Sequence, residues 1–111
     1  MVKSDPQTTD DAVFKALGNA ERRFLLDALR DGEQTTGDLC QALPRLNRCT
    51  VMQHLGVLEK SGLVISSKRG RQRWYALDVA PIQRIYNRWI SDFAAPSAQM
   101  LTALKDDLES V

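Results

Sequence analysis

Residues 35–77 read TTGDLCQALPRLNRCTVMQHLGVLEKSGLVISSKRGRQRWYAL, and this stretch decides the fold. Thr35, followed three residues later by Asp38, forms a capping-box pattern that opens a short helix, TGDLCQAL, which closes before a proline. A tight turn follows, and Asn47 caps a second helix, RCTVMQHLGVLEKS. Two short helices joined by a tight turn predict a helix-turn-helix over about 35–61.

The segment that follows the second helix predicts a β-hairpin. Gly62 ends the helix, and the residues after it are rich in strand-forming types, from 63 to 68 and again from 72 to 77. Arg69-Gly70-Arg71 joins the two runs, and the glycine permits a positive φ at the tip. A hairpin directly after a helix-turn-helix is a wing, which we expect over about 63–77.

The chain before residue 35 predicts two further helices. The first spans 10–17, behind Thr9 or Asp10 as a cap. The second has the sequence AERRFLLDALRDG, is capped by Asn19 and is expected to end at Gly32 in a left-handed conformation. Its inward stripe is expected to consist of Phe24, Leu25, Ala28 and Leu29. The predicted fold class is therefore mainly α with a small β-hairpin, a winged helix-turn-helix with C-terminal dimerisation helices.

The tail is unusually apolar for an α-helical extension. Asp78 or Ala80 with Pro81 opens one helix, and Pro96 opens another. Such stripes would leave a large apolar patch if they were unpaired, and homodimerisation would cover it. We expect the dimerisation helices over about 79–109, together with the helix at about 10–17. The expected interface residues are Phe14, Ile82, Ile85, Trp89, Phe93, Met100 and Leu104.

The composition suits one globular domain that spans residues 1–111. Apolar residues make up 43% of the 111 residues and charged residues 26%, which is ordinary for a folded chain and unlike a disordered one. The polar start MVKSDPQTTDD lacks the apolar core of a signal peptide, and no apolar run is long enough to span a membrane. These features predict a cytoplasmic protein.

The charges are unevenly distributed along the chain. The overall net charge is +1, but the segment from Arg45 to Arg73 carries a net charge of +6 and the remainder carries −5. Lys and Arg gathered in one segment are typical of a surface that binds phosphates. A solvated charged face is the alternative reading of the charge run alone.

The helix after Asn47 has an outward face that suits the major groove of DNA. Gln53 offers a donor and an acceptor to adenine, and Arg48 can reach guanine or phosphate. Small neighbours allow close approach, although an ordinary amphipathic helix would show the same spacing. His54 lies at the edge of the buried face, which favours packing or a phosphate contact. The expected DNA contacts are Arg48, Cys49, Thr50, Gln53 and His54 on this helix, and Lys68, Arg69, Arg71 and Arg73 on the wing.

Four pieces of the sequence together resemble a known family. FKALGNAERRFLLDALRDGE, DLCQAL, TVMQHLGVLEKSGLV and GRQRWYALD, within residues 12–78, are similar to the ArsR (ArsR/SmtB) family of bacterial winged-helix repressors. The resemblance implies a homodimer that binds a palindromic operator in double-stranded DNA and is released by an inducer. The tail resembles a subgroup found beside genes for START-like (SRPBCC) domain proteins.

The metal-sensing patterns of that family are not matched. Residues 38–42 hold one thiol instead of a Cys-x-Cys pair, and residues 80–93 contain no histidine, so we expect neither a metal site nor a cofactor. No His is paired with Ser, Cys or a carboxylate at a recognisable spacing, so we expect no enzyme activity. A winged-helix protein-interaction module without specific DNA binding is the alternative function.

The two cysteines, Cys40 and Cys49, suggest different roles. Cys40 lies in the expected inward stripe of its helix, which suits a small buried apolar residue. Cys49 lies in the first turn of the recognition helix and points outward, so an adduct on its sulfur would stand between helix and groove. Cys49 is therefore a candidate thiol switch.

Overall fold

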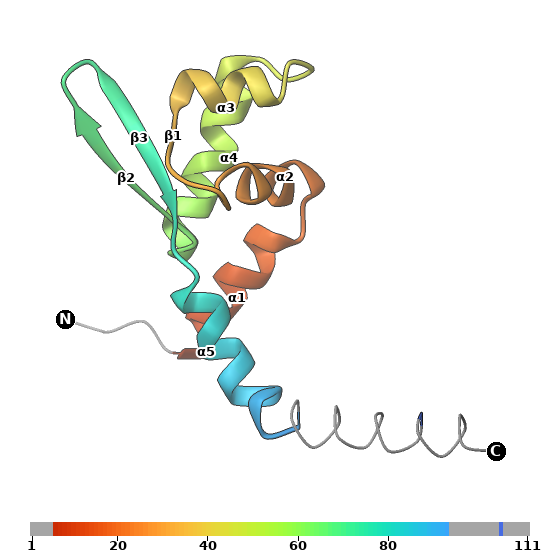
Figure 1. Cartoon of the computed structure of the whole chain (residues 1–111). Coiled ribbons are helices and arrows are strands. Elements are labelled where there is room, and N and C mark those ends of the chain that lie inside the picture. The colour runs from red at the N-terminus through yellow and green to blue at the C-terminus, as the bar shows by residue number, and fades with distance from the viewer. Residues whose placement is uncertain (1–5, 94–104, 106–111) are drawn as a thin grey trace. The chain divides into compact units, whose positions relative to one another are not determined.

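The computed structural model describes residues 6–93 and 105, and the elements of this part of the chain follow the order of a winged helix (Figure 1). The described residues form five α-helices and three β-strands. Their bounds are α1 Pro6–Leu17, α2 Ala20–Ala28, β1 Gln34–Thr35, α3 Thr36–Ala42, α4 Arg48–Ser61, β2 Val64–Arg69, β3 Gln72–Leu77 and α5 Ala80–Trp89. The chain divides into two compact units, 1–81 and 82–111.

The helix-turn-helix has the expected caps. The hydroxyl of Thr35 accepts the N–H of Asp38, and the Asp38 carboxylate accepts the N–H of Thr35, both at 3.1 Å, which confirms the capping box of α3. The amide oxygen of Asn47 accepts the N–H of Thr50 at 2.8 Å at the start of α4. Gly62 ends α4 with a φ of 83°, a left-handed conformation that glycine adopts without strain. The predicted bounds of α4 are confirmed.

The ends of the first two helices differ from the prediction. Helix α1 begins at Pro6 and not after Thr9 or Asp10, because proline has the fixed φ that suits the first turn of a helix. Helix α2 is capped by Asn19 as expected but ends at Ala28. The prediction that Gly32 ends this helix is wrong, since the turn after Ala28 closes through tighter bonds, such as Arg30 N–H to Asp27 C=O.

The buried face of α2 is shifted by one residue from the predicted stripe. Leu25, Leu26 and Leu29 are buried, whereas Phe24 is 46% exposed. The run Phe-Leu-Leu allows two helical phases, and packing in the folded chain selects the leucine pair. The prediction that Phe24 points inward is therefore wrong.

A third strand, which the sequence pattern did not reveal, joins the wing to the helix-turn-helix. The sheet has the order β1-β3-β2 and is antiparallel throughout. Gln34 pairs with Tyr75 and Thr35 pairs with Trp74, so β1 lies against β3 immediately before α3 begins. The base of the wing is thus hydrogen-bonded to the strand that leads into the helix-turn-helix.

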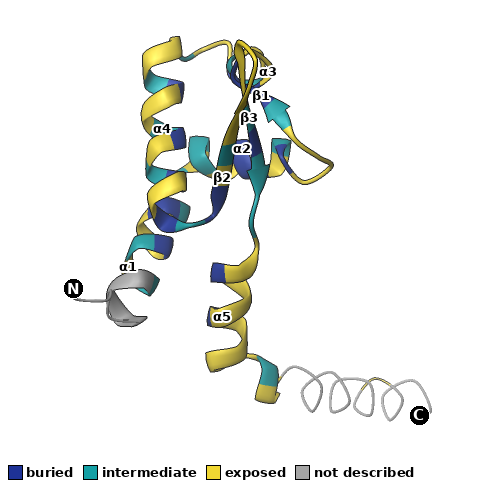
Figure 2. Ribbon diagram, turned by 90° about the vertical axis from the view of Figure 1, so that its left-hand side faces the viewer, coloured by how far each residue is buried: buried dark blue, intermediate teal, exposed yellow. Residues whose placement is uncertain are grey.

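The core of the first unit lies where the helices meet the base of the sheet (Figure 2). Helix α4 buries Val51, Leu55 and Leu58, and its remaining surface is largely exposed. On β3, Tyr75 is only 1% exposed and anchors the sheet to this core, whereas the hairpin tip is exposed. The largest fully buried side chains are Tyr75, Leu25, Leu39, Leu55, Leu58, Leu63, Val13, Val51 and Val64.

Candidate nucleic-acid interface

The outward surface of α4 is polar and accessible, as its sequence predicts. Arg48, Cys49 and Gln53 are exposed, and Thr50 is half-buried next to them. Gly56 leaves open space beside the helix one turn further along, because no atom outside its chain neighbours and the helix's own nearby backbone lies within 4 Å of where a Cβ would stand. This surface combines hydrogen-bonding groups with small residues, the combination that a helix in a major groove requires.

His54 on α4 is hydrogen-bonded to Arg22 on α2. It is half-buried, and its Nδ1 lies 3.3 Å from a guanidinium nitrogen of Arg22. Because a guanidinium can only donate, Nδ1 is the acceptor. Arg22 also donates to the carbonyls of Ala16, at 2.8 Å, and Lys15, at 3.0 Å. One arginine therefore joins the end of α1 to α4, and a DNA contact by His54 stays a prediction.

The wing is a regular hairpin with a short connection. Arg69 pairs with Gln72, and Gly70, at the first position between them, has a φ of 63°. Lys68, Arg71 and Arg73 are exposed together with Arg69, so all four predicted basic residues reach solvent. Arg73 donates a hydrogen bond to the hydroxyl of Ser66 at 3.0 Å. Because the hydroxyl is neutral, this bond does not offset the positive charge of Arg73.

Arg69 differs from the other wing cations because it has a carboxylate partner. Its guanidinium contacts the two oxygens of Glu33 at 2.8 and 3.0 Å and lies 5.5 Å from the centroid of the Trp74 ring. The hydrogen bond and the charge of Glu33 raise the pKa of Arg69. Sequence reasoning missed this pair, because Glu33 precedes the unrecognised strand β1, which brings it beside the hairpin. Within residues 6–93, no carboxylate makes a salt bridge with Arg48, Lys68, Arg71 or Arg73.

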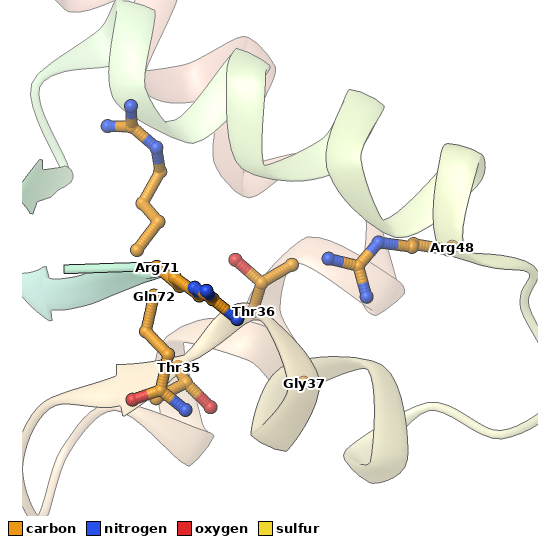
Figure 3. Close-up of a pocket in the computed structure, with 7 residues that line it drawn as sticks. Thr35, Thr36, Gly37, Arg48, Arg71 and Gln72 are labelled. Carbon is orange, nitrogen blue, oxygen red and sulfur yellow. The ribbon is translucent and has the colours of Figure 1, made fainter. Parts of the chain in front are cut away.

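A depression of about 240 Å³ lies between the helix-turn-helix and the wing (Figure 3). It is lined by residues 35–37 at the start of α3, by Arg48 at the start of α4, and by residues 71–73 of the wing. The guanidinium groups of Arg48 and Arg71 point toward one another from opposite sides of Thr36 (Figure 3). None of the described residues that line it is acidic, so the depression gathers positive charge.

The predicted dimerisation residues fall into three groups. Phe14 on α1 and Ile82, Trp89 and Phe93 in the second unit are between 38% and 66% exposed, whereas Ile85 is 9% exposed. Tyr86 and Ile90 are exposed large apolar residues of the same segment. Met100 and Leu104 lie outside the described residues.

Both cysteines are free thiols. Cys49 is exposed. Cys40 is half-buried, whereas its position in the predicted inward stripe led us to expect full burial.

In the described part of the chain, no three His, Cys, Asp or Glu side chains are grouped to hold a metal ion. A search of the same residues finds no helix long and apolar enough to cross a membrane.

Comparison with known proteins points to one family of regulators. Residues 19–66 match the family model described as "Bacterial regulatory protein, arsR family". The chain is 35% identical over 88 residues to the HTH-type transcriptional regulator YuzN of Bacillus subtilis, an alignment covering 72% of this chain and 94% of that protein. It is 28% identical over 81 residues to the transcriptional repressor SdpR of B. subtilis, covering 73% and 88% of the two chains.

A solved structure agrees with this assignment. The ArsR-like transcriptional regulator from Rhodococcus sp. RHA1 superposes with a TM-score of 0.68 at 30% identity, and the match covers 93% of each chain. The winged helix-turn-helix that was predicted from residues 35–77 is confirmed by this likeness and by the order of the observed elements.

Proposed function

We propose that this chain, which belongs to the ArsR family of bacterial regulatory proteins and is a DNA-binding transcriptional regulator, acts as a homodimeric repressor on a palindromic operator. The carrying observation is the exposed polar face of α4 beside a basic wing. Gln53 on that face can read a base edge, and Arg71 on the wing can contact the backbone. Base contacts supply specificity, and backbone contacts supply orientation and affinity.

The exposed apolar side chains of the second unit support the homodimer. Ile82, Tyr86 and Trp89 follow helical spacing along α5 and are all exposed. A second copy of the chain is an economical cover for such a face. A twofold axis would present two recognition helices about one DNA turn apart, ~34 Å, and a palindromic operator follows from that symmetry.

Repression is proposed from the likeness to SdpR, whose name describes a transcriptional repressor. A dimer of this kind represses by occupying DNA that the transcription machinery needs, which requires no catalytic group. The cytoplasm, where bacterial DNA lies, is the proposed location.

A protein-interaction module is the alternative, because a winged helix can also bind a protein partner. The two functions differ in the charge that they require. A protein-binding wing has no need for Lys68, Arg69, Arg71 and Arg73 together, whereas a wing that lies against phosphates does.

Selection of duplexes from a random pool, followed by gel shift, tests the proposal. We expect the full chain to enrich a palindrome whose half-sites are about one turn apart, and to bind it with an affinity that falls steeply as salt rises. The DNA upstream of its own gene is a second probe. Enrichment of no sequence would contradict the proposed function, and enrichment of a single asymmetric site would contradict the homodimer.

A further inference from the structure

We propose that the depression between α3, α4 and the wing is the seat of one backbone phosphate of the operator, which Arg48 and Arg71 hold together. The inference rests on the proposed function and deepens it. It assigns Arg48 to a phosphate and not to guanine. It also places the tip of the wing next to the DNA strand whose backbone the start of α4 contacts.

The first argument is the convergence of like charges. Arg48 comes from the first residue of α4 and Arg71 from the hairpin turn, yet their guanidinium groups point toward one another (Figure 3). Two cations repel, and no acidic side chain lines the depression between them. A phosphate between the two groups supplies the missing negative charge and accepts hydrogen bonds from both.

The second argument is the contrast with Arg69, two residues before Arg71. Glu33 holds the Arg69 guanidinium through two contacts, at 2.8 and 3.0 Å. A fork of two donors facing two oxygens is the geometry in which arginine binds phosphate as well as carboxylate. Among residues 6–93, the protein thus fills this geometry itself at Arg69 and leaves it open at Arg71.

The third argument is size and wall chemistry. A volume of about 240 Å³ holds a phosphate group with a few waters, since one water takes up ~30 Å³. Thr35 and Thr36 are buried in the floor, and Gln72 adds a polar side chain at the rim. A polar, open hollow of this kind suits an oxyanion that remains attached to a polymer.

Substitution of single phosphates by neutral methylphosphonates tests the proposal. The probe is the duplex that the full chain selects from a random pool, with one methylphosphonate at each position of a half-site in turn. We expect one position at which this change costs the wild-type protein about tenfold in affinity, the scale of one hydrogen-bonded charge pair. Arg48→Ala and Arg71→Ala should each lose about threefold of this sensitivity at that same position, because the other arginine still contacts the phosphate.

Arg30→Ala is the matched control, because it removes an exposed arginine away from the depression and should retain the tenfold sensitivity. Thermal unfolding of each variant separates a lost contact from a lost fold. If the two variants lose sensitivity at different phosphates, there is no shared seat. If Arg48→Ala instead keeps the sensitivity and loses a preference for guanine, Arg48 reads a base and the proposal is wrong.

A salt titration separates failure of this inference from failure of the proposed function. The chain could select no sequence but bind duplexes in general. In that case the double variant Arg48→Ala/Arg71→Ala should reduce the slope of log affinity against log salt concentration by about 0.9 per protomer, the value for one phosphate. A decrease of about 1.8 would indicate two separate phosphates and overturn the shared seat. Absence of binding to any duplex would overturn both proposals.

Discussion

Helices α4 and α5 are both amphipathic, but α4 buries its apolar face, whereas α5 buries Ile85 and leaves other large apolar side chains exposed. Val51, Leu55 and Leu58 of α4 are buried, and what remains exposed is mostly polar. In contrast, Tyr86 and Trp89 of α5 are 38% and 49% exposed. The comparison teaches that the two helices are suited to different partners: α4 to a hydrogen-bonding, charged one and α5 to an apolar one.

The largest expected effect comes from a charge on the apolar face of α5. Tyr86→Glu should weaken the proposed dimer by at least about 100-fold, because a carboxylate would be desolvated in the interface. Sedimentation velocity at micromolar concentration measures the change. Gln83→Glu adds the same charge at an exposed polar position and should leave the dimer intact. A wild-type protein that sediments as a monomer would contradict the dimer.

A bulky adduct on the outward face of α4 should have the next largest effect. Alkylation of Cys49, which is exposed, is expected to reduce operator affinity about thirtyfold, ~2 kcal/mol, because the adduct would stand between helix and groove. Gel shifts of alkylated wild type, Cys40→Ser and Cys49→Ser measure it. Loss of binding that persists in alkylated Cys49→Ser would rule out this thiol as the cause.

Removal of a base-reading group should have an effect of similar size that depends on the DNA sequence. Gln53→Ala and Thr50→Ala are each expected to reduce discrimination between operator variants by ~1–3 kcal/mol per base contact, while binding to unrelated DNA changes little. Competition gel shifts measure the ratio. Gln41→Ala, at an exposed position of α3, is the matched control. An unchanged preference in Gln53→Ala would show that this face of α4 does not read the groove.

The smallest expected effect is an increase in affinity for DNA. Glu33→Gln removes the carboxylate that holds Arg69, so the freed guanidinium can contact DNA. We expect affinity for all duplexes to rise about threefold at low salt, with a steeper salt dependence. Titration by fluorescence anisotropy at several salt concentrations measures both quantities. If Glu33→Gln instead weakens binding, the pair positions the wing and does not withhold a cation.

Local signals explain why the helix-turn-helix could be predicted. Thr35, Asp38, Asn47 and Gly62 act on residues within one helical turn, so their caps are readable from the sequence, and the observed bounds of α4 agree. The candidate interface could be predicted for the same reason, because the outward face of a helix and a basic hairpin are both local sequence patterns. Its division into base and phosphate contacts stays a proposal.

The features that sequence reasoning missed depend on distant contacts. Strand β1 has two residues, which is too short for any periodicity, and it exists because it pairs with β3. The Glu33–Arg69 pair and the link from Arg22 to His54 are likewise formed between residues far apart in the chain. The phase of α2 was missed because Phe24, Leu25 and Leu26 are all apolar.

The pairing of β1 with β3 also constrains the order of folding. Gln34 and Tyr75 lie on either side of the whole helix-turn-helix, so the pairing closes a loop that contains both of its helices. The entropic cost of closing this loop is smaller after α3 and α4 have packed together. The hairpin of β2 and β3 is local in sequence and can form before the loop closes. The backbone amides of β1 should therefore exchange with solvent only when the helix-turn-helix opens, which makes them reporters of its cooperative unfolding.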